Sequence, residues 1–142
     1  MERMALYQKP RDYKELLEQF GLSELAKSPV NKLSGGERQR LSVALALIGN
    51  PEIVFLDELT TGLDVAARRE VWKTLKDLKD RGMTIFLTTH YMEEAEKLCD
   101  KVMLLKHGKI VTEGTLEEVI QKSPYDNLEE AYLWYMDEEV TL

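Results

Sequence analysis

The sequence constrains the fold most tightly between Asn50 and Asp64, where it reads NPEIVFLDELTTGLD. Residues 53–56 are apolar and largely β-favouring, and the run is too short for a typical helix, which predicts a strand buried on both faces. Asp57 and Glu58 follow where this strand leaves the core. Open α/β sheets bind ligands at the carboxyl ends of their strands. The pair therefore suits a magnesium site in which one carboxylate holds a hydrated cation and the other accepts a proton from an attacking water.

A second strand is predicted at residues 84–87, TIFL, and His90 follows its end. A neutral imidazole beside Asp57 and Glu58 could donate a hydrogen bond to a phosphate and help to orient the attacking water. Taken alone, an acidic pair after an apolar strand is common by chance, and a histidine near a loop is usually a surface residue. The neighbouring motifs decide between these interpretations.

A capping box predicts the start of a helix upstream of the first strand. Ser34 and Glu37 have the S-x-x-E spacing, and Gly35 and Gly36 lie between them. An apolar stripe follows at Leu41, Ala44, Leu45 and Ile48. Because the glycines carry no side chains to shield the first-turn N–H groups, an anion can approach the positive end of the helix dipole. The alternative is a well-capped helix whose glycines ease a tight turn.

Together these segments resemble the nucleotide-binding domain of ABC transporters. LSGGE at 33–37 matches the signature motif, IVFLDE at 53–58 matches the Walker B strand with its glutamate, TGLD at 61–64 matches the D-loop, and His90 matches the switch histidine. The resemblance covers nearly the whole chain but only the second half of the family's domain. It implies an α/β fold, namely a partial P-loop NTPase (ABC ATPase) fold with parallel strands, flanking helices and a C-terminal β-hairpin.

The resemblance also implies roles for individual residues, with Asp57 holding magnesium through water and Glu58 acting as the general base. The signature of one domain contacts the ATP γ-phosphate held by the opposite domain of a dimer, so residues 34–37 would act in trans. Asp64 would help to couple the two sites, although it is equally suited to cap the helix that follows. Where the family usually has proline, this chain has Leu59. We expect this departure to change the stiffness of the turn rather than the chemistry.

We expect residues 1–48 to form the remainder of a helical subdomain, including the signature motif and its helix, and residues 49–142 to form the C-terminal half of the catalytic core. Apolar periodicity predicts a helix from Asp64 to Gly82 and another through Tyr91 and Leu98, whose glutamates form a solvated face. A hairpin is predicted at 102–111 with His107 in its turn, followed by a terminal helix over 128–136 that closes the core.

Composition excludes some classes of function. Among 142 residues, 19 Lys and Arg against 26 Asp and Glu give a net charge of −7, which argues against a nucleic-acid-binding surface. The longest apolar run, residues 43–48, falls short of the roughly twenty residues that a membrane span needs. Without a signal-peptide pattern, and with Cys99 as the lone cysteine, we expect a reducing cytoplasm. The resemblance places such a chain at the membrane through a permease subunit.

The phosphate-cradling P-loop, G-x-x-x-x-G-K-[ST], is absent from the sequence. The resemblance implies ATP and Mg²⁺ as cofactors of the complete domain, with a P-loop-containing half or a full ATPase domain as partner. Because the P-loop strand normally belongs to the same sheet, we expect a hydrophobic strand edge and a helix-facing apolar surface to be uncovered, which favours self-association through the exposed sheet edge, strand exchange or docking to that half.

Three functions are consistent with these residues. The first is the C-terminal half of an ABC transporter ATPase that hydrolyses ATP once a P-loop half completes it. The second is a non-catalytic module that lends its signature in trans, and the third is a fragment of a soluble ABC protein of translation or DNA repair. The acidic charge and the TTGLD sequence favour the transporter form over the third.

We predict that the chain by itself binds Mg-ATP no more tightly than the high micromolar to millimolar range, because the main phosphate cradle is missing. Isothermal titration calorimetry measures this directly, with Mg-ADP as the companion ligand. Low-micromolar binding of Mg-ATP would show that other residues of the chain bind the phosphates.

Overall fold

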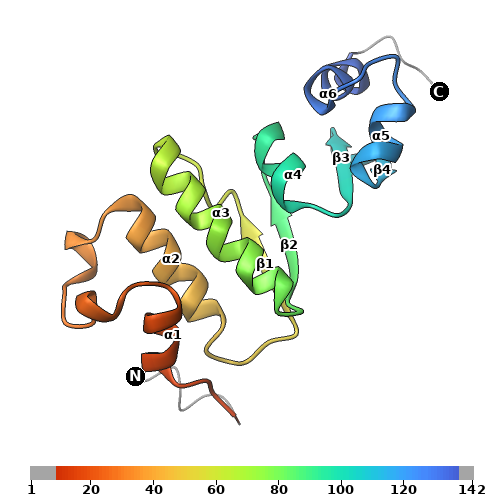
Figure 1. The fold of residues 1–142 in the computed structure, drawn as a ribbon. Coiled ribbons are helices and arrows are strands. Elements are labelled where there is room, and N and C mark those ends of the chain that lie inside the picture. Colours follow the sequence, from red (N-terminus) through yellow and green to blue (C-terminus); the bar gives the residue numbers. More distant parts are fainter. Residues whose placement is uncertain (1–8, 138–142) are drawn as a thin grey trace. The chain divides into compact units, whose positions relative to one another are not determined.

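Two units make up residues 9–137, the part of the chain that the computed structural model describes, and Figure 1 labels their elements. The first unit ends at Thr88 and contains α1 (Tyr13–Gln19), η2 (Ser23–Leu25), η3 (Val30–Lys32), α2 (Gly35–Ala46), β1 (Ile53–Asp57), α3 (Val65–Asp80) and β2 (Thr84–Thr88). The second begins at Thr89 and contains α4 (Met92–Leu98), β3 (Val102–Lys106), β4 (Lys109–Gly114), α5 (Leu116–Gln121) and α6 (Leu128–Met136).

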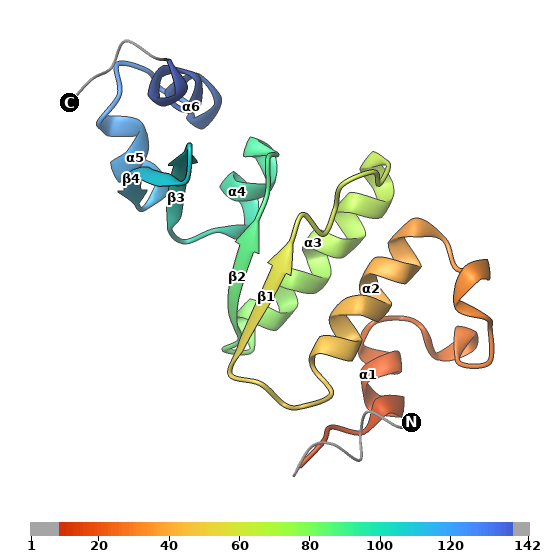
Figure 2. The ribbon, with the colours of Figure 1, turned by 180° about the vertical axis from the view of Figure 1, so that it is seen from behind.

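The predicted strands β1 and β2 pair in parallel. Their register aligns the two strands from end to end, with Ile53 opposite Thr84 and Asp57 opposite Thr88. Helix α3 lies over one face of this sheet in both views (Figures 1 and 2). Its buried residues are Val71, Trp72, Leu75 and Leu78, and Val54 and Leu56 are the buried residues of β1. The parallel pair with flanking helices confirms the expected fold class.

The other face of the sheet is exposed, so the prediction of a strand buried on both faces is wrong. Phe55 is 69% exposed, and Ile53 and Phe86 are also exposed. The rings of Phe55 and Phe86 pack against each other with their centroids 5.4 Å apart. Within residues 9–88 the helices lie away from this face, which Figure 2 presents to the viewer. The face is the uncovered apolar surface expected above.

Helix α2 packs against α1 on one side and α3 on another. The backbone N–H of Arg11, before α1, donates to the carbonyl of Ile48 over 2.8 Å, which fixes the segment that follows α2. The predicted apolar stripe of α2 is partly correct. Ala44 and Ile48 are buried, whereas Leu45 is exposed.

The second unit is built on the antiparallel hairpin of β3 and β4, as predicted. Both turn residues, His107 and Gly108, have positive φ angles of 50° and 76°, as a tight hairpin turn requires. The terminal helix α6 closes the core as predicted, and the Tyr135 hydroxyl donates to the Val119 carbonyl over 2.9 Å. The buried core comprises Ala95, Val102, Leu104, Val119, Leu128, Ala131 and Tyr135.

One acidic residue of α4 departs from the predicted solvated face. Glu93 and Glu96 are exposed, but Glu94 is fully buried. Glu94 lies in the first turn of α4, where the positive end of the helix dipole favours a carboxylate.

The subdivision predicted at residues 48 and 49 concerns subdomains of the family's complete domain and stays a prediction. Among the described residues, no helix combines the length and the apolarity that crossing a membrane requires.

The chain turns sharply after β1 at Glu58, whose φ of 45° lies in the left-handed region. Two hydrogen bonds hold this turn. The Glu58 N–H donates to the Thr88 carbonyl over 3.0 Å, and the Thr61 N–H donates to the Glu58 carbonyl over 3.1 Å. Non-glycine residues adopt such a conformation only where the surrounding structure enforces it.

We predict that Glu58→Gly leaves the chain more stable than Glu58→Ala by about 1 kcal/mol, because a Cβ is strained at positive φ. Urea unfolding of the two variants measures the difference. Lys73, exposed in the middle of α3, provides the control. There the alanine variant should be the more stable one, since glycine weakens a helix interior. Equal stability of the two Glu58 variants would contradict the proposed strain.

Candidate functional site

The carboxyl ends of β1 and β2 bring Asp57, Glu58 and Thr88 together. The Thr88 hydroxyl donates a hydrogen bond to Oδ1 of Asp57, and both residues are exposed. The Glu58 N–H lies 3.0 Å from the Thr88 carbonyl oxygen and 3.3 Å from the Thr88 hydroxyl oxygen. Thr88 therefore orients the first carboxylate and anchors the backbone of the second.

Sequence reasoning missed the role of Thr88. A signal was available, because the two predicted strands have similar lengths and are each followed by polar residues. Parallel strands that pair in register place their last residues side by side. The side chain after TIFL should therefore meet the side chain after IVFL.

The donors at this site fit a hydrated magnesium ion. Mg²⁺ prefers oxygen ligands, keeps several waters, and binds proteins through one or two carboxylates together with substrate phosphates. Asp57 offers an exposed carboxylate whose orientation is set by a hydroxyl. Within residues 9–137, no three His, Cys, Asp or Glu side chains gather as a metal-binding cluster. Most ligands of such an ion would have to be water and phosphate oxygens.

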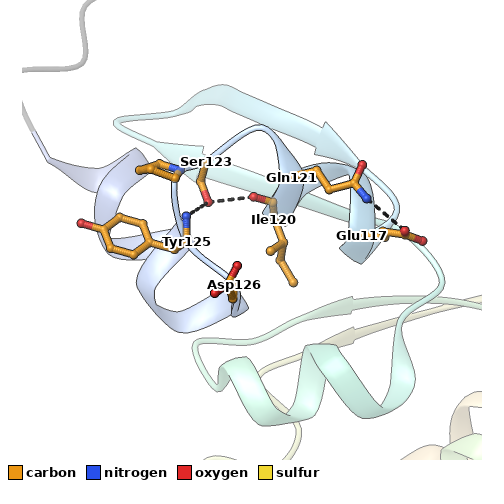
Figure 3. Close-up of a pocket in the computed structure, with 7 residues that line it drawn as sticks. Glu117, Ile120, Gln121, Ser123, Tyr125 and Asp126 are labelled. Atoms are coloured by element: carbon orange, nitrogen blue, oxygen red, sulfur yellow. Dashed lines mark hydrogen bonds between the residues drawn. The ribbon is translucent and has the colours of Figure 1, made fainter.

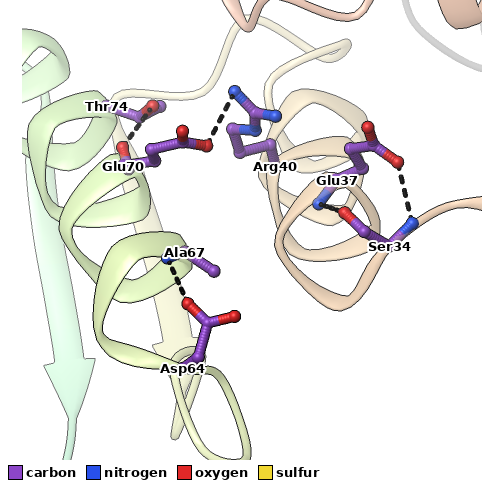
Figure 4. A network of polar contacts seen from close by, with 7 residues as sticks. All are labelled: Ser34, Glu37, Arg40, Asp64, Ala67, Glu70 and Thr74. Carbon is purple, nitrogen blue, oxygen red and sulfur yellow. Dashed lines mark hydrogen bonds and ion pairs between the residues drawn. The ribbon is translucent and has the colours of Figure 1, made fainter.

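The signature segment forms the first turn of α2, as Figure 4 shows. Ser34 and Glu37 make the predicted reciprocal bonds. The Glu37 N–H donates to Ser34 Oγ over 3.2 Å, and the Ser34 N–H donates to Glu37 Oε2 over 2.7 Å. Ser34 is exposed, whereas Gly36 is buried. The remaining first-turn N–H groups have no acceptor within the helix, so the positive end of α2 is chemically suited to an anion.

Asp64 caps α3, which confirms one of its two predicted roles. Its Oδ1 accepts the Ala67 N–H over 2.8 Å (Figure 4). The second role, coupling of two sites across a dimer, stays a prediction. Because α2 and α3 pack together, the structure brings the Asp64 segment and the signature segment into one packed layer of the first unit.

His90 belongs to the second unit and lies two residues beyond the end of β2. It is exposed, and its ring packs on that of Tyr91 with centroids 4.2 Å apart. The Tyr91 N–H donates to the Thr89 hydroxyl over 3.0 Å, which orders the turn into α4. The approach of His90 to the carboxylates of the first unit stays a prediction.

Leu59 and Thr60, which follow the acidic pair, are both buried. Leu59 therefore does more than change the stiffness of a turn, because its side chain belongs to the buried core. Sequence reasoning treated Leu59 only as a substitute for proline and did not identify it as a core residue.

A shallow hollow in the second unit contains none of the predicted site residues. Residues between Glu117 and Asp126 line it, and Figure 3 shows the turn that shapes it. Ser123 Oγ donates to the Ile120 carbonyl over 2.8 Å and accepts the Tyr125 N–H over 3.2 Å. These polar groups serve the turn between α5 and α6.

Comparison with known proteins shows which family the sequence matches. Residues 2–61 match the family described as ABC transporter. Daunorubicin resistance ATP-binding protein DrrA3 of Streptomyces coeruleorubidus is 43% identical over 115 residues, which are 81% of this chain and 36% of that protein. Nod factor export ATP-binding protein I of Ralstonia nicotianae is 48% identical over 105 residues, 74% of this chain and 33% of that protein. The chain thus spans about a third of the length of these curated relatives.

A solved structure shares the fold. It is described as a metal-chelate type ABC transporter in an inward-facing conformation, and it aligns with a TM-score of 0.74 and 28% identity over 82% of this chain and 50% of that one. The matched motifs, the relatives and the common fold agree. The chain belongs to the ABC transporter family of ATP-binding proteins.

Proposed function

We propose that this chain supplies the water-activating and dimer-closing parts of an ABC transporter ATPase, which hydrolyses ATP and drives transport when a P-loop-bearing half completes it. The observation that carries the proposal is the arrangement of Asp57, Glu58 and Thr88 at the carboxyl ends of paired parallel strands. The names of the relatives, which refer to drug resistance and to export, support an export-type transporter.

In this proposal each residue of the site has a separate task. Asp57, held by the Thr88 hydroxyl, binds the hydrated cation through water. Glu58 accepts the proton of the attacking water as general base, and His90 donates a hydrogen bond to the γ-phosphate. When bound, Mg²⁺ neutralises charge on the phosphate oxygens. The left-handed φ of Glu58 ends the extended backbone of β1 directly after Asp57.

The signature turn is proposed to close the ATP site of an opposite domain. Ser34 and the first-turn N–H groups of α2 present hydrogen-bond donors and the positive end of a 12-residue helix. Glu37 completes the cap of that turn, and Asp64 couples the two sites from the start of α3. We propose that the complete subunit works on the cytoplasmic side of the membrane, attached through a permease subunit.

The exposed sheet face is proposed to receive the P-loop-bearing half. Ile53, Phe55 and Phe86 form an apolar surface on a two-stranded sheet, and such a small sheet needs further cover to be stable. The solved ABC transporter chain is twice as long as the part that this chain matches, which supports a half of similar size as the occupant. In its absence, self-association through the same face would hide the two aromatic rings.

A second candidate function is the non-catalytic module that lends its signature to a complete ATPase. The cap of α2 favours it, because the reciprocal hydrogen bonds of Ser34 and Glu37 form entirely within this chain. Both candidates use residues 34–37, but only the first requires Glu58 as a base.

A mixing experiment separates the two candidates. The chain is combined either with the P-loop-bearing N-terminal part of the Streptomyces coeruleorubidus relative or with that relative at full length, and ATP hydrolysis is measured. If the first candidate is correct, hydrolysis appears with the N-terminal part, and Glu58→Gln lowers kcat by at least about a hundredfold. Glu52→Gln, an exposed neighbour before β1, serves as the matched control and should change little.

If the second candidate is correct, the chain stimulates the full-length relative. Ser34→Arg then abolishes the stimulation because it removes the cap and sets a cation against the helix dipole, whereas Glu58→Gln has no effect. Failure of the unaltered chain to support hydrolysis in either mixture would refute both candidates.

The sheet face gives a separate prediction. Phe55→Ser should weaken binding of the P-loop-bearing half, and self-association in its absence, by at least about tenfold, because burial of a phenylalanine side chain contributes about 1.5–3 kcal/mol. Sedimentation velocity measures both. Val30→Ser removes a similarly exposed apolar residue of the first unit and is the control. If the unaltered chain stays monomeric at high concentration and does not bind the P-loop-bearing half, the docking role of this face is wrong.

A further inference from the structure

Helices α2 and α3 approach each other closely at their first turns, where the signature glycines meet the start of α3. A Cβ placed on Gly36 would lie 3.1 Å from Cβ of Ala67. A Cβ placed on Gly35 would lie 3.0 Å from Cδ2 of Leu63. Both separations are shorter than ordinary van der Waals contact between carbon atoms. The two glycines therefore have a packing reason to be glycine, independent of any ligand.

Ala67 takes part in two interactions at this contact. Its N–H donates to the Asp64 carboxylate over 2.8 Å, and its methyl group faces the backbone of Gly36. Gly36 in turn lies inside the turn that the Ser34 and Glu37 cap closes. A displacement of Asp64 or Ala67 is thus passed directly to the signature turn, because no side-chain torsion separates the Ala67 methyl group from its backbone.

A second contact joins the same two helices one turn further on. Arg40 Nη1 of α2 lies 3.5 Å from Glu70 Oε2 of α3, and the Arg40 side chain is only 20% exposed (Figure 4). Since Glu70 is largely exposed, this ion pair contributes less to stability than the packing of Ala67 against Gly36. Its value is geometric, because it opposes rotation of one helix against the other about the Gly36 contact.

We infer that the signature turn, residues 34–37, and the D-loop segment, residues 61–64, form one rigid body. Ala67 sets the position of these two segments relative to each other. Ala67 is a positioning residue that acts through Gly36 and Asp64. The inference rests on the proposed function where it assigns the two segments to the closure of an opposite site. Its consequence there is that the two segments move toward or away from that site together.

The two glycines are expected to respond differently to alanine. At Gly35 the obstructing atom is the end of the Leu63 side chain, which can rotate away. At Gly36 the obstructing atom is a Cβ fixed to the backbone of α3, so the helices themselves must separate. This difference provides a matched pair of variants. It also provides a rescue, because Ala67→Gly removes the obstructing methyl group and leaves the Ala67 Cα at 3.7 Å, an ordinary contact.

The test measures amide hydrogen exchange by NMR in the full chain, with the Ala67 N–H on α3 and the Glu37 N–H on α2 as reporters. Gly36→Ala should raise the exchange rate of the Ala67 amide by roughly five- to a hundredfold, the range that overpacking produces, and Gly35→Ala should change it by less than about threefold. The double variant with Gly36→Ala and Ala67→Gly should return the rate to within about threefold of its original value.

A reciprocal variant covers the case in which Gly36→Ala prevents folding. Ala67→Ser adds a single oxygen on the α3 side of the contact and should accelerate exchange of the Glu37 amide on α2. No effect of Ala67→Ser on Glu37, or failure of Ala67→Gly to rescue Gly36→Ala, would overturn the inference. A failed rescue would mean that the Gly36 position is required for another reason.

Hydrolysis in the mixing experiment separates this inference from the proposed function. If the exchange pattern holds but even the unaltered chain supports no hydrolysis, the proposed function fails and the rigid body stands. If hydrolysis occurs, falls in the Gly36→Ala variant and recovers in the double variant, both the proposed function and the rigid body hold. If hydrolysis occurs while the exchange rates on the two helices change independently, the rigid body is wrong.

Discussion

The in-register parallel pairing of β1 with β2 is the constraint on which the site depends. Side chains alternate between the two faces of a strand, so the register that hides Val54 and Leu56 also assigns Phe55 and Asp57 to the opposite face. A slip of one residue would exchange the two sets and leave Asp57 without its threonine partner. The burial of apolar side chains beneath α3 therefore selects the register, and the register selects the chemistry at the strand ends.

The second determinant is the packing of α2 on α3. Both helices begin with a side-chain cap, at Ser34 and at Asp64, and both caps lie beside the contact between the helices. Caps fix where a helix starts, and a glycine opposite an alanine fixes how closely two helices approach. The chain uses both devices at one place, which gives the first turns a defined position without a large side chain between them.

The sequence predicted well those features that arise from local interactions. The caps of α2 and α3, the parallel strands, and the hairpin with His107 in its turn all carry their signals within a few residues. Features that depend on distant segments were predicted less completely, since an uncovered apolar surface was expected but residues 53–56 were still assigned to a strand buried on both faces. The exposure of Phe55 depends on what covers a sheet face, and the partner of Asp57 lies 31 residues away along the chain.

The same distinction explains the remaining errors within the site. The glycines of the signature were interpreted through the N–H groups they leave open, since that is a property of the segment itself. Their contacts with Leu63 and Ala67 could not be inferred, because the approach of two helices depends on the whole shape of both. The burial of Glu94 was missed for a similar reason, since a helix with many glutamates most simply exposes them.

The uncovered sheet face also bears on the fate of the chain in a cell. Paired aromatic rings on a short sheet, such as Phe55 and Phe86, are the kind of surface through which unassembled proteins aggregate or are triaged by chaperones and proteases. If the proposed half covers this surface, the lifetime of the polypeptide depends on how soon the two meet after synthesis, and its abundance follows the supply of that half.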